Sequence, residues 1–128
     1  MKLTGKIVKR DDDKFLIFGY ASVADVEDSQ GDVISIAELE KAAYRFITWG
    51  GAAGEMHRNF SKIADIVESV VFTPEKLEML GLEKDALPHG WWIGMKVRDA
   101  DVWQKIKNGD YKSFSIGGYA TREEVAND

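Results

Sequence analysis

The chain has 128 residues, which suits one domain with one hydrophobic core, and we expect residues 1–128 to form a single domain. Hydrophobic residues make up 45% and charged residues 30%, the balance of an ordinary soluble globular protein. The net charge of -5 argues against a nucleic-acid-binding surface. No apolar run is long enough to span a bilayer, and the first residues lack the apolar core of a signal peptide.

Two strands are predicted at the start of the chain, in residues 3–10 and 14–25, because both segments are rich in β-branched and aromatic residues. Asp11-Asp12-Asp13 between them predicts a hairpin turn. The segment 25–32 is dense in turn-forming residues, so we expect it to be a loop.

A helix is predicted after this loop, because Ser35 and Glu38 have the spacing of a capping box. Gly50-Gly51 is the expected end of the helix. Apolar residues recur at helical intervals between these points and predict one buried stripe, formed by Ile36, Leu39, Ala43, Phe46 and Ile47.

The rest of the chain alternates predicted strands with short helices. Thr73-Pro74 and Asp99 are typical helix starts, and Asn108-Gly109 is a typical helix end. The predicted strands are 52–58, 62–73, 90–98 and 111–125. The sum is an α+β fold of six or seven strands with two or three short peripheral helices. Short links favour an antiparallel sheet closed into a small barrel over a doubly wound parallel sheet.

The amino-acid inventory limits the chemistry. Cysteine is absent, which excludes disulfides, thiol catalysis and cysteine-ligated zinc. Histidine occurs only as His57 and His89, and the sequence contains no HExxH, no phosphate loop and no GxGxxG turn. We therefore expect neither a metal nor a cofactor. A hydroxyl nucleophile with a histidine base remains open.

Ser115 and His57 could form such a nucleophile–base pair, because strand alternation can place both side chains on one outer surface. In the last strand Ser113 and Ser115 lie opposite the apolar face that contains Phe114. If that apolar face fills the barrel, both serines point outward, and the same parity points His57 outward. A serine hydroxyl needs a base such as neutral imidazole, and a third group, usually a carboxylate, holds the ring. Gly117-Gly118 leaves open backbone for a substrate strand or an oxyanion site.

More ordinary roles compete with these assignments. Most strand serines are structural, and so are most surface histidines. His89 lies in the string LPHGWW and is interpreted as a turn residue. The tryptophans 91, 92 and 103 are interpreted as core or interface residues.

The chain contains, in this order, the segments FGYASVADVEDSQGDVISIAELEKAAYRF, GEMHRN, DIVESVVFTPEKL and LPHGWWIGMKVRDADVWQKIKNGDYKSFSIGGYA. This ordered set resembles phage prohead-maturation serine proteases, and the last two segments resemble their XkdF-like branch. The resemblance runs from about Phe15 to Ala120. No single motif in it is specific, but the ordered set is.

This resemblance implies a fold related to the herpesvirus assemblins, which are small antiparallel barrels with serine and histidine on the outside. The family histidine matches His57, and the family serine matches Ser115. Such proteases cleave scaffold and capsid precursors inside the assembling prohead in the host cytoplasm. The implied partners are scaffold and capsid proteins and the portal, with no nucleic acid and no membrane. A homodimer or larger homo-oligomer is also implied.

The third catalytic residue stays open between Glu68, which is the first choice, Asp65 and Glu55. Arg122 is a guess for an oxyanion arginine. Many family members place further strands beyond the serine strand, whereas this sequence stops ten residues after Gly118. The chain is therefore either a truncated domain or a shorter branch.

Two other functions remain. One is a non-catalytic module that binds portal, scaffold or capsid protein. The other is a metal-dependent hydrolase built from His57 and the acidic loop residues Asp25, Glu27, Asp28 and Asp32.

Overall fold

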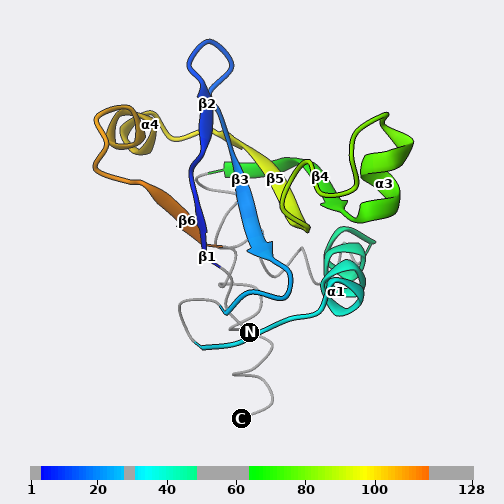
Figure 1. Cartoon of the computed structure of the whole chain (residues 1–128). Helices are drawn as coiled ribbons and strands as arrows, with labels where there is room; N and C mark the ends of the chain where they lie inside the picture. The colour runs from blue at the N-terminus through cyan, green and yellow to red at the C-terminus, as the bar shows by residue number, and fades with distance from the viewer. Residues whose placement is uncertain (1–3, 28–30, 49–63, 116–128) are drawn as a thin grey trace.

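The computed structural model describes residues 4–27, 31–48 and 64–115 (Figure 1). Six strands and three helices occur in these ranges, which confirms a mixed α+β fold. The strands are β1 (Thr4–Lys6), β2 (Lys9–Asp11), β3 (Leu16–Val23), β4 (Ala64–Phe72), β5 (Gly90–Val97) and β6 (Ser113–Ser115). The helices are α1 (Ile36–Thr48), α3 (Pro74–Met79) and α4 (Ala100–Lys107).

The strands form two antiparallel sheets. One has four strands in the order β2-β3-β5-β4, and the other pairs β1 with β6. Helices α1 and α3 lie toward the β4 edge of the four-stranded sheet, and α4 lies toward its β2 edge, beside β6 (Figure 1). The antiparallel pairing is confirmed. Closure of the sheets into a barrel stays a prediction.

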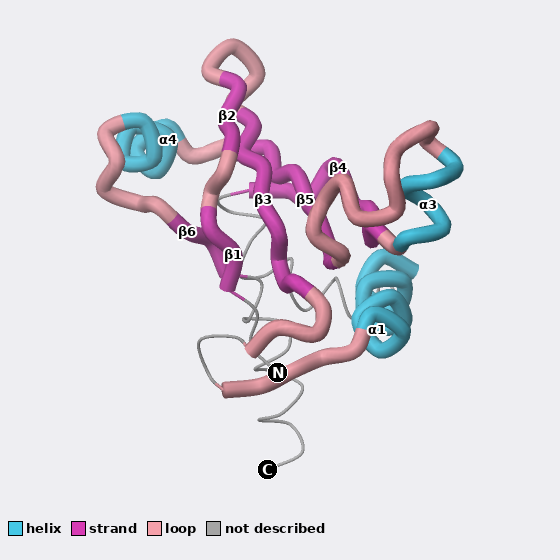
Figure 2. Tube along the Cα trace, viewed as in Figure 1, coloured by secondary structure: helices cyan, strands magenta, loops and turns pink. Residues whose placement is uncertain are grey.

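The segment predicted as one N-terminal strand is two strands, because its pairing partner changes. The backbone N–H of Ile7 donates to the carbonyl of Lys112 at 2.9 Å, beside β6. The next N–H, that of Val8, donates to the carbonyl of Phe18 in β3 at 2.8 Å. The chain therefore leaves one sheet and joins the other within two residues, which is the break between β1 and β2 in Figure 2.

The predicted hairpin turn joins β2 to β3. The Asp11 carboxylate accepts hydrogen bonds from the backbone N–H groups of Asp13 and Lys14, both at 3.1 Å. Phe15 completes the turn in the left-handed region, at φ 58°. Non-glycine residues rarely adopt this region. The Phe15 ring lies 5.1 Å from that of Trp103 in α4.

Local capping starts all three helices, as predicted. The Ser35 hydroxyl accepts from the Glu38 N–H at 3.2 Å, the Thr73 hydroxyl accepts from the Lys76 N–H at 3.2 Å, and the Asp99 carboxylate accepts from the Val102 N–H at 3.0 Å. Each cap satisfies an N–H group that has no partner inside its helix.

The predicted stripe of α1 is confirmed for Leu39, Ala43 and Phe46, which are buried. The prediction was wrong for Ile47, whose side chain is 52% exposed. Adjacent helical positions are about 100° apart, so Ile47 turns away from the face that contains Phe46.

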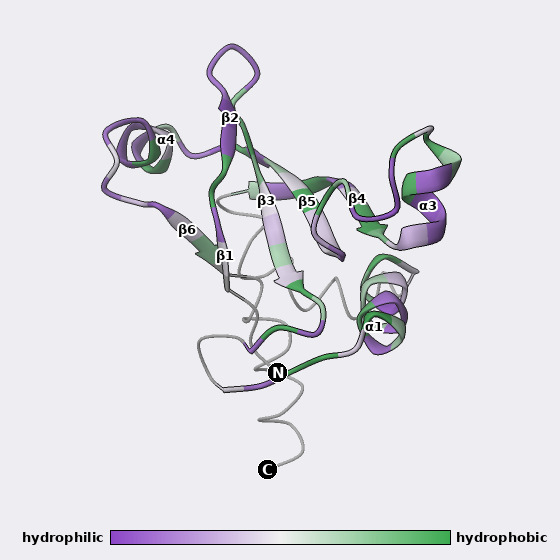
Figure 3. Ribbon diagram, viewed as in Figure 1, coloured by the Kyte–Doolittle hydropathy of each residue, from purple (hydrophilic) through white to green (hydrophobic). Residues whose placement is uncertain are grey.

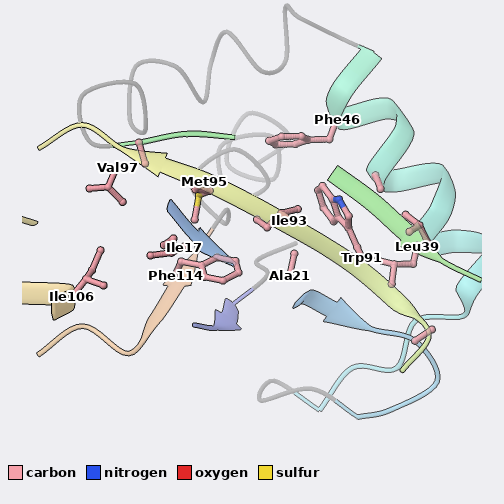
Figure 4. Packing of buried hydrophobic residues seen from close by; sticks show 14 of the residues in the cluster. Ile17, Ala21, Leu39, Phe46, Trp91, Ile93, Met95, Val97, Ile106 and Phe114 are labelled. Atoms are coloured by element: carbon pink, nitrogen blue, oxygen red, sulfur yellow. The ribbon is translucent and has the colours of Figure 1, made fainter. Parts of the chain in front are cut away.

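The core lies between the four-stranded sheet, α1 and the β1-β6 pair. One face of β5 contributes Trp91, Ile93, Met95 and Val97. Phe46 of α1 meets the Trp91 ring edge-on at a centroid distance of 5.4 Å, and Phe114 enters from β6 (Figure 4). The face of each strand opposite this core is its outer face, which is where the candidate site is expected.

Candidate active site

Ser115 is the last described residue of β6, and its Cα pairs with that of Thr4 in β1. The preceding residues alternate as predicted, with Ser113 exposed and Phe114 buried. Only the backbone of Ser115 is described, so the direction of its hydroxyl stays a prediction.

Strand β1, which pairs with the strand of Ser115, contacts β3 closely at two glycines. A Cβ on Gly5 would lie 2.2 Å from the carbonyl oxygen of Tyr20, and a Cβ on Gly19 would lie 2.2 Å from that of Lys6. These distances are possible only without side chains, so β1 and β3 approach closely at this point. The Phe114 ring covers the contact, at 2.4 Å from the Cβ position of Gly5. The register of β6 is therefore set by Phe114 against two glycines.

Glu68 lies in β4 and is exposed on the sheet face opposite Trp91 and Ile93. It follows a β-bulge between Ile66 and Glu68, and its Cα pairs with that of Gly94. The Glu68 Cγ and an edge carbon of Phe18 both lie within 3.0 Å of where a Gly94 Cβ would stand. The absent side chain at position 94 therefore lets Glu68 lie flat over β5.

Phe18, Trp92 and Tyr20 lie on the same sheet face as Glu68. Phe18 stacks on Trp92 at 6.4 Å, and Tyr20 meets Trp92 edge-on at 5.0 Å. The Tyr20 hydroxyl donates to the Pro88 carbonyl at 2.9 Å, and burial raises the pKa of Tyr20.

Asp65, the second choice for the acid, is already engaged. Its carboxylate accepts from Arg98 Nε at 3.0 Å, in a pair about two-fifths exposed on each side. A carboxylate held by a guanidinium is poorly placed to orient an imidazole as well. Glu68 has no comparable ion pair with any residue that the structure describes.

The strands of Ser115 and Glu68 belong to different sheets, and no hydrogen-bonded ladder joins β6 to β4 in the described residues. His57, Glu55 and Arg122 lie outside the described residues, and so do Gly117 and Gly118. Whether Ser115, His57 and Glu68 lie close together in space therefore stays a prediction.

The remaining predicted residues have ordinary structural roles. His89 Nε2 lies 2.8 Å from the Lys84 carbonyl and 3.4 Å from an Asp85 carboxylate oxygen, so it stabilises the turn before β5, as predicted. Trp91 is buried, and its Nε1 donates to the Ser69 hydroxyl at 2.9 Å. Trp103 is also buried and Trp92 is half-buried.

Across 4–27, 31–48 and 64–115, no three acidic or histidine side chains gather closely enough to hold a metal ion. The acidic loop is only partly described, because Asp28 lies outside these ranges. No helix in the described part of the chain is long and apolar enough to cross a membrane.

Lys76 is the centre of the main polar cluster of the described residues, which joins α3 to α1. Its ammonium group donates to Glu40 at 2.9 Å, to the Tyr44 hydroxyl at 2.7 Å and to the Val71 carbonyl at 3.0 Å. The hydrogen bond from Lys76 lowers the pKa of Glu40, with a smaller contribution from Tyr44. Burial alone would lower the pKa of Lys76, but its bonds to Tyr44 and Glu40 together outweigh burial and raise it.

Residues 4–124 match the family described as "Putative phage serine protease XkdF", and the chain belongs to that family. It is 30% identical over 114 residues to "Uncharacterized protein YqbD" of Bacillus subtilis (strain 168), covering 89% of this chain and 34% of that protein. It is 29% identical over 109 residues to "Phage-like element PBSX protein XkdF" of the same strain, covering 85% of this chain and 38% of that protein.

The chain thus spans little more than a third of the length of these curated relatives. No solved structure matches it. The description of the family favours a hydrolase of the serine-protease type for this chain.

Proposed function

We propose that the chain is a serine endopeptidase domain that cleaves scaffold or capsid precursor protein during phage prohead maturation. Membership of the phage serine protease family is the observation that carries this proposal. The position of Ser115 in a strand whose register is fixed by Phe114 and two glycines supports it, because a nucleophile needs a rigid support.

The proposed chemistry uses Ser115, His57 and Glu68. The His57 imidazole takes the proton of the Ser115 hydroxyl as the serine oxygen attacks the scissile carbonyl, and it then gives that proton to the leaving amine. The Glu68 carboxylate holds the imidazole in the useful tautomer and stabilises its charged form. Glu68 is favoured over Asp65 because Arg98 already binds Asp65.

We propose further that the two sheets are parts of one small barrel. The close approach of β1 to β3 at Gly5 and Gly19 supports this, because it continues the order of strands from β4 to β6. Closure between β4 and β6 would make the strands of Glu68 and Ser115 neighbours. Glu68 lies on the face opposite the core, which is the face that alternation predicts for Ser115.

The proposed setting is the assembling prohead in the host cytoplasm. Scaffold and capsid proteins are the proposed substrates, and the portal is a proposed neighbour. A homodimer or larger homo-oligomer is the proposed active form, and its activity should rise with protein concentration.

The test is co-expression with the cognate scaffold and capsid precursors, followed by intact-mass analysis of the products. Ser115→Ala should abolish cleavage, whereas Ser113→Ala, two residues away in the same strand, should retain it. Undiminished cleavage by Ser115→Ala would remove Ser115 as the nucleophile. Absence of cleavage by the unsubstituted chain in every oligomeric state would instead favour the non-catalytic module.

The third residue is tested by a matched pair in β4. Glu68→Gln should lower the cleavage rate by about 10²–10⁴-fold, because a neutral amide cannot stabilise the charged imidazole. Asp65→Asn should leave the rate within a few-fold, because its partner is Arg98. The reverse order of effects would transfer the role to Asp65.

A further inference from the structure

A groove opens between the N-terminal strands and the loop that follows α4. It has a volume of about 350 Å³, and four of the residues that line it are basic, namely Lys6, Lys9, Arg10 and Lys112. The hydrogen bond from the Ile7 N–H to the Lys112 carbonyl joins its two walls. No acidic residue is among the described residues that line the groove.

This concentration of positive charge occurs on a chain whose net charge is -5. Arg10 is partly neutralised, because its Nε lies 2.8 Å from an Asp12 carboxylate oxygen. The three groove lysines are exposed and form no ion pair with any carboxylate in the described ranges. Like charges without counter-charges repel one another, so the groove is suited to an anionic partner.

Apolar groups accompany these charges. The side chain of Val8 is 55% exposed and that of Tyr111 is 45% exposed, and Ile106, which also lines the groove, is buried. Lys105 Nζ lies 5.5 Å from the centre of the Tyr111 ring and adds a positive charge beside that ring. A polypeptide that mixes carboxylates with apolar side chains fits both features. Nucleic acid is a uniform polyanion, and it would be repelled by the acidic remainder of the chain.

The groove also adjoins the strand of the proposed nucleophile. Lys6 pairs with Ser113, and Ser115 pairs with Thr4. Two residues along a strand span about 7 Å, so the groove begins roughly that far from Ser115 along β6. An extended polypeptide bound across Ser115 would therefore place a side chain two or three residues from the cleaved bond at Lys6 or Lys112.

We propose that this groove binds an acidic stretch of the substrate polypeptide, interspersed with apolar residues, beside the bond that is cleaved. This inference rests on the proposed protease function and names a specificity determinant for it. Figure 3 shows the hydrophilic residues of β2, its turn and the loop between α4 and β6, around this region.

Binding is to be measured without turnover, in the Ser115→Ala chain. The probes are a fluorescein-labelled peptide that alternates Glu with Leu and Val, and the same peptide with Gln in place of Glu. Fluorescence anisotropy should show about tenfold tighter binding of the Glu peptide, because two or three exposed ion pairs each contribute a few-fold. Raising the salt from about 50 to about 300 mM should remove most of this preference.

The double variant Lys6→Gln, Lys112→Gln should bind the Glu peptide no better than the Gln peptide. The matched control is Lys41→Gln, Lys84→Gln, which changes the net charge equally at exposed lysines in α1 and before β5, and it should keep the preference. Equal binding of the two peptides, equal loss in the control, or displacement of the peptide by a single-stranded oligonucleotide at lower concentration would overturn the inference. Peptide binding does not require a nucleophile, so failure here and failure of the Ser115→Ala cleavage test are distinguishable.

Discussion

The charged side chains on the two sides of the molecule differ in the partners that they have. On the side of α1 and α3, the Lys76 ammonium group is bound by Glu40, Tyr44 and a backbone carbonyl. On the side of β1, β2 and β6, Arg10 pairs with Asp12, whereas the three groove lysines face solvent without carboxylate partners among the described residues. The first arrangement holds two helices together, whereas the second leaves its charges available to another molecule.

This difference predicts that substitutions on the two sides have different consequences. Changes around α1 and α3 should alter stability, because the contacts there are internal. Changes in the groove should alter recognition and leave stability almost unchanged. The junction of β1 with β3 should matter for both, because it links the core to the strand of Ser115.

The largest effect on stability is expected for Leu39→Ala. Leu39 is fully buried in α1, so its removal should lower the free energy of unfolding by about 2–5 kcal/mol. Ile47→Ala in the same helix is the control, and it should change this energy by less than about 0.5 kcal/mol because Ile47 is exposed. Urea denaturation measures both. Equal losses would place Ile47 in the core after all.

Gly19→Ala should come next. Its new methyl group would meet the Lys6 carbonyl oxygen, which is backbone and cannot move aside. We expect the free energy of unfolding to fall by about 1–3 kcal/mol. The cleavage rate should also fall at temperatures where the variant remains folded. An unchanged denaturation midpoint would show that β1 does not lie against β3 in solution.

Glu40→Gln should have a smaller and pH-dependent effect. The pKa of Glu40 is lowered in the folded state, so its pairing stabilises the fold above the ordinary value of 4.5 and is lost as pH falls through the lower folded value. The variant should therefore be less stable by about 1 kcal/mol at neutral pH and equal to the unsubstituted chain in strong acid. Thermal unfolding from pH 7 down to pH 2 checks this, with Glu78→Gln in α3 as the control. A difference that persists at the lowest pH would contradict the charge pairing.

The smallest effect on stability is expected for Lys6→Gln with Lys112→Gln. Neither lysine has a charged partner in the described structure, so the free energy of unfolding should change by less than about 0.5 kcal/mol. A large loss, measured by the same urea denaturation, would show that these lysines serve the fold and not an external partner.

Local signals in the sequence predicted the local structure well. The caps at Ser35, Thr73 and Asp99 depend on residues two or three positions away, and all three were predicted correctly. The hairpin after Asp11 was predicted for the same reason. The strand break at Ile7 and Val8 was not, because it depends on partners in β6 and β3 that are remote in sequence.

The candidate site shows the same limit. Alternation along β6 predicted that Ser113 would be exposed and Phe114 buried. The pairing of Asp65 with Arg98 had no signal, because β4 and the end of β5 meet only in the fold. The basic groove was also missed, since its lysines lie near the two ends of the sequence and the chain as a whole is acidic. The acidic composition argued against nucleic-acid binding, but a net charge does not reveal a local concentration of positive charge.

The most direct test of the proposed protease is covalent labelling with a fluorophosphonate probe, followed by peptide mass mapping. A serine activated by a base reacts with such a probe, whereas an ordinary strand serine does not. We expect one label per chain, on Ser115, retained in Ser113→Ala and strongly slowed in His57→Ala. Absence of labelling at every protein concentration, or a label that persists in Ser115→Ala, would contradict the assignment.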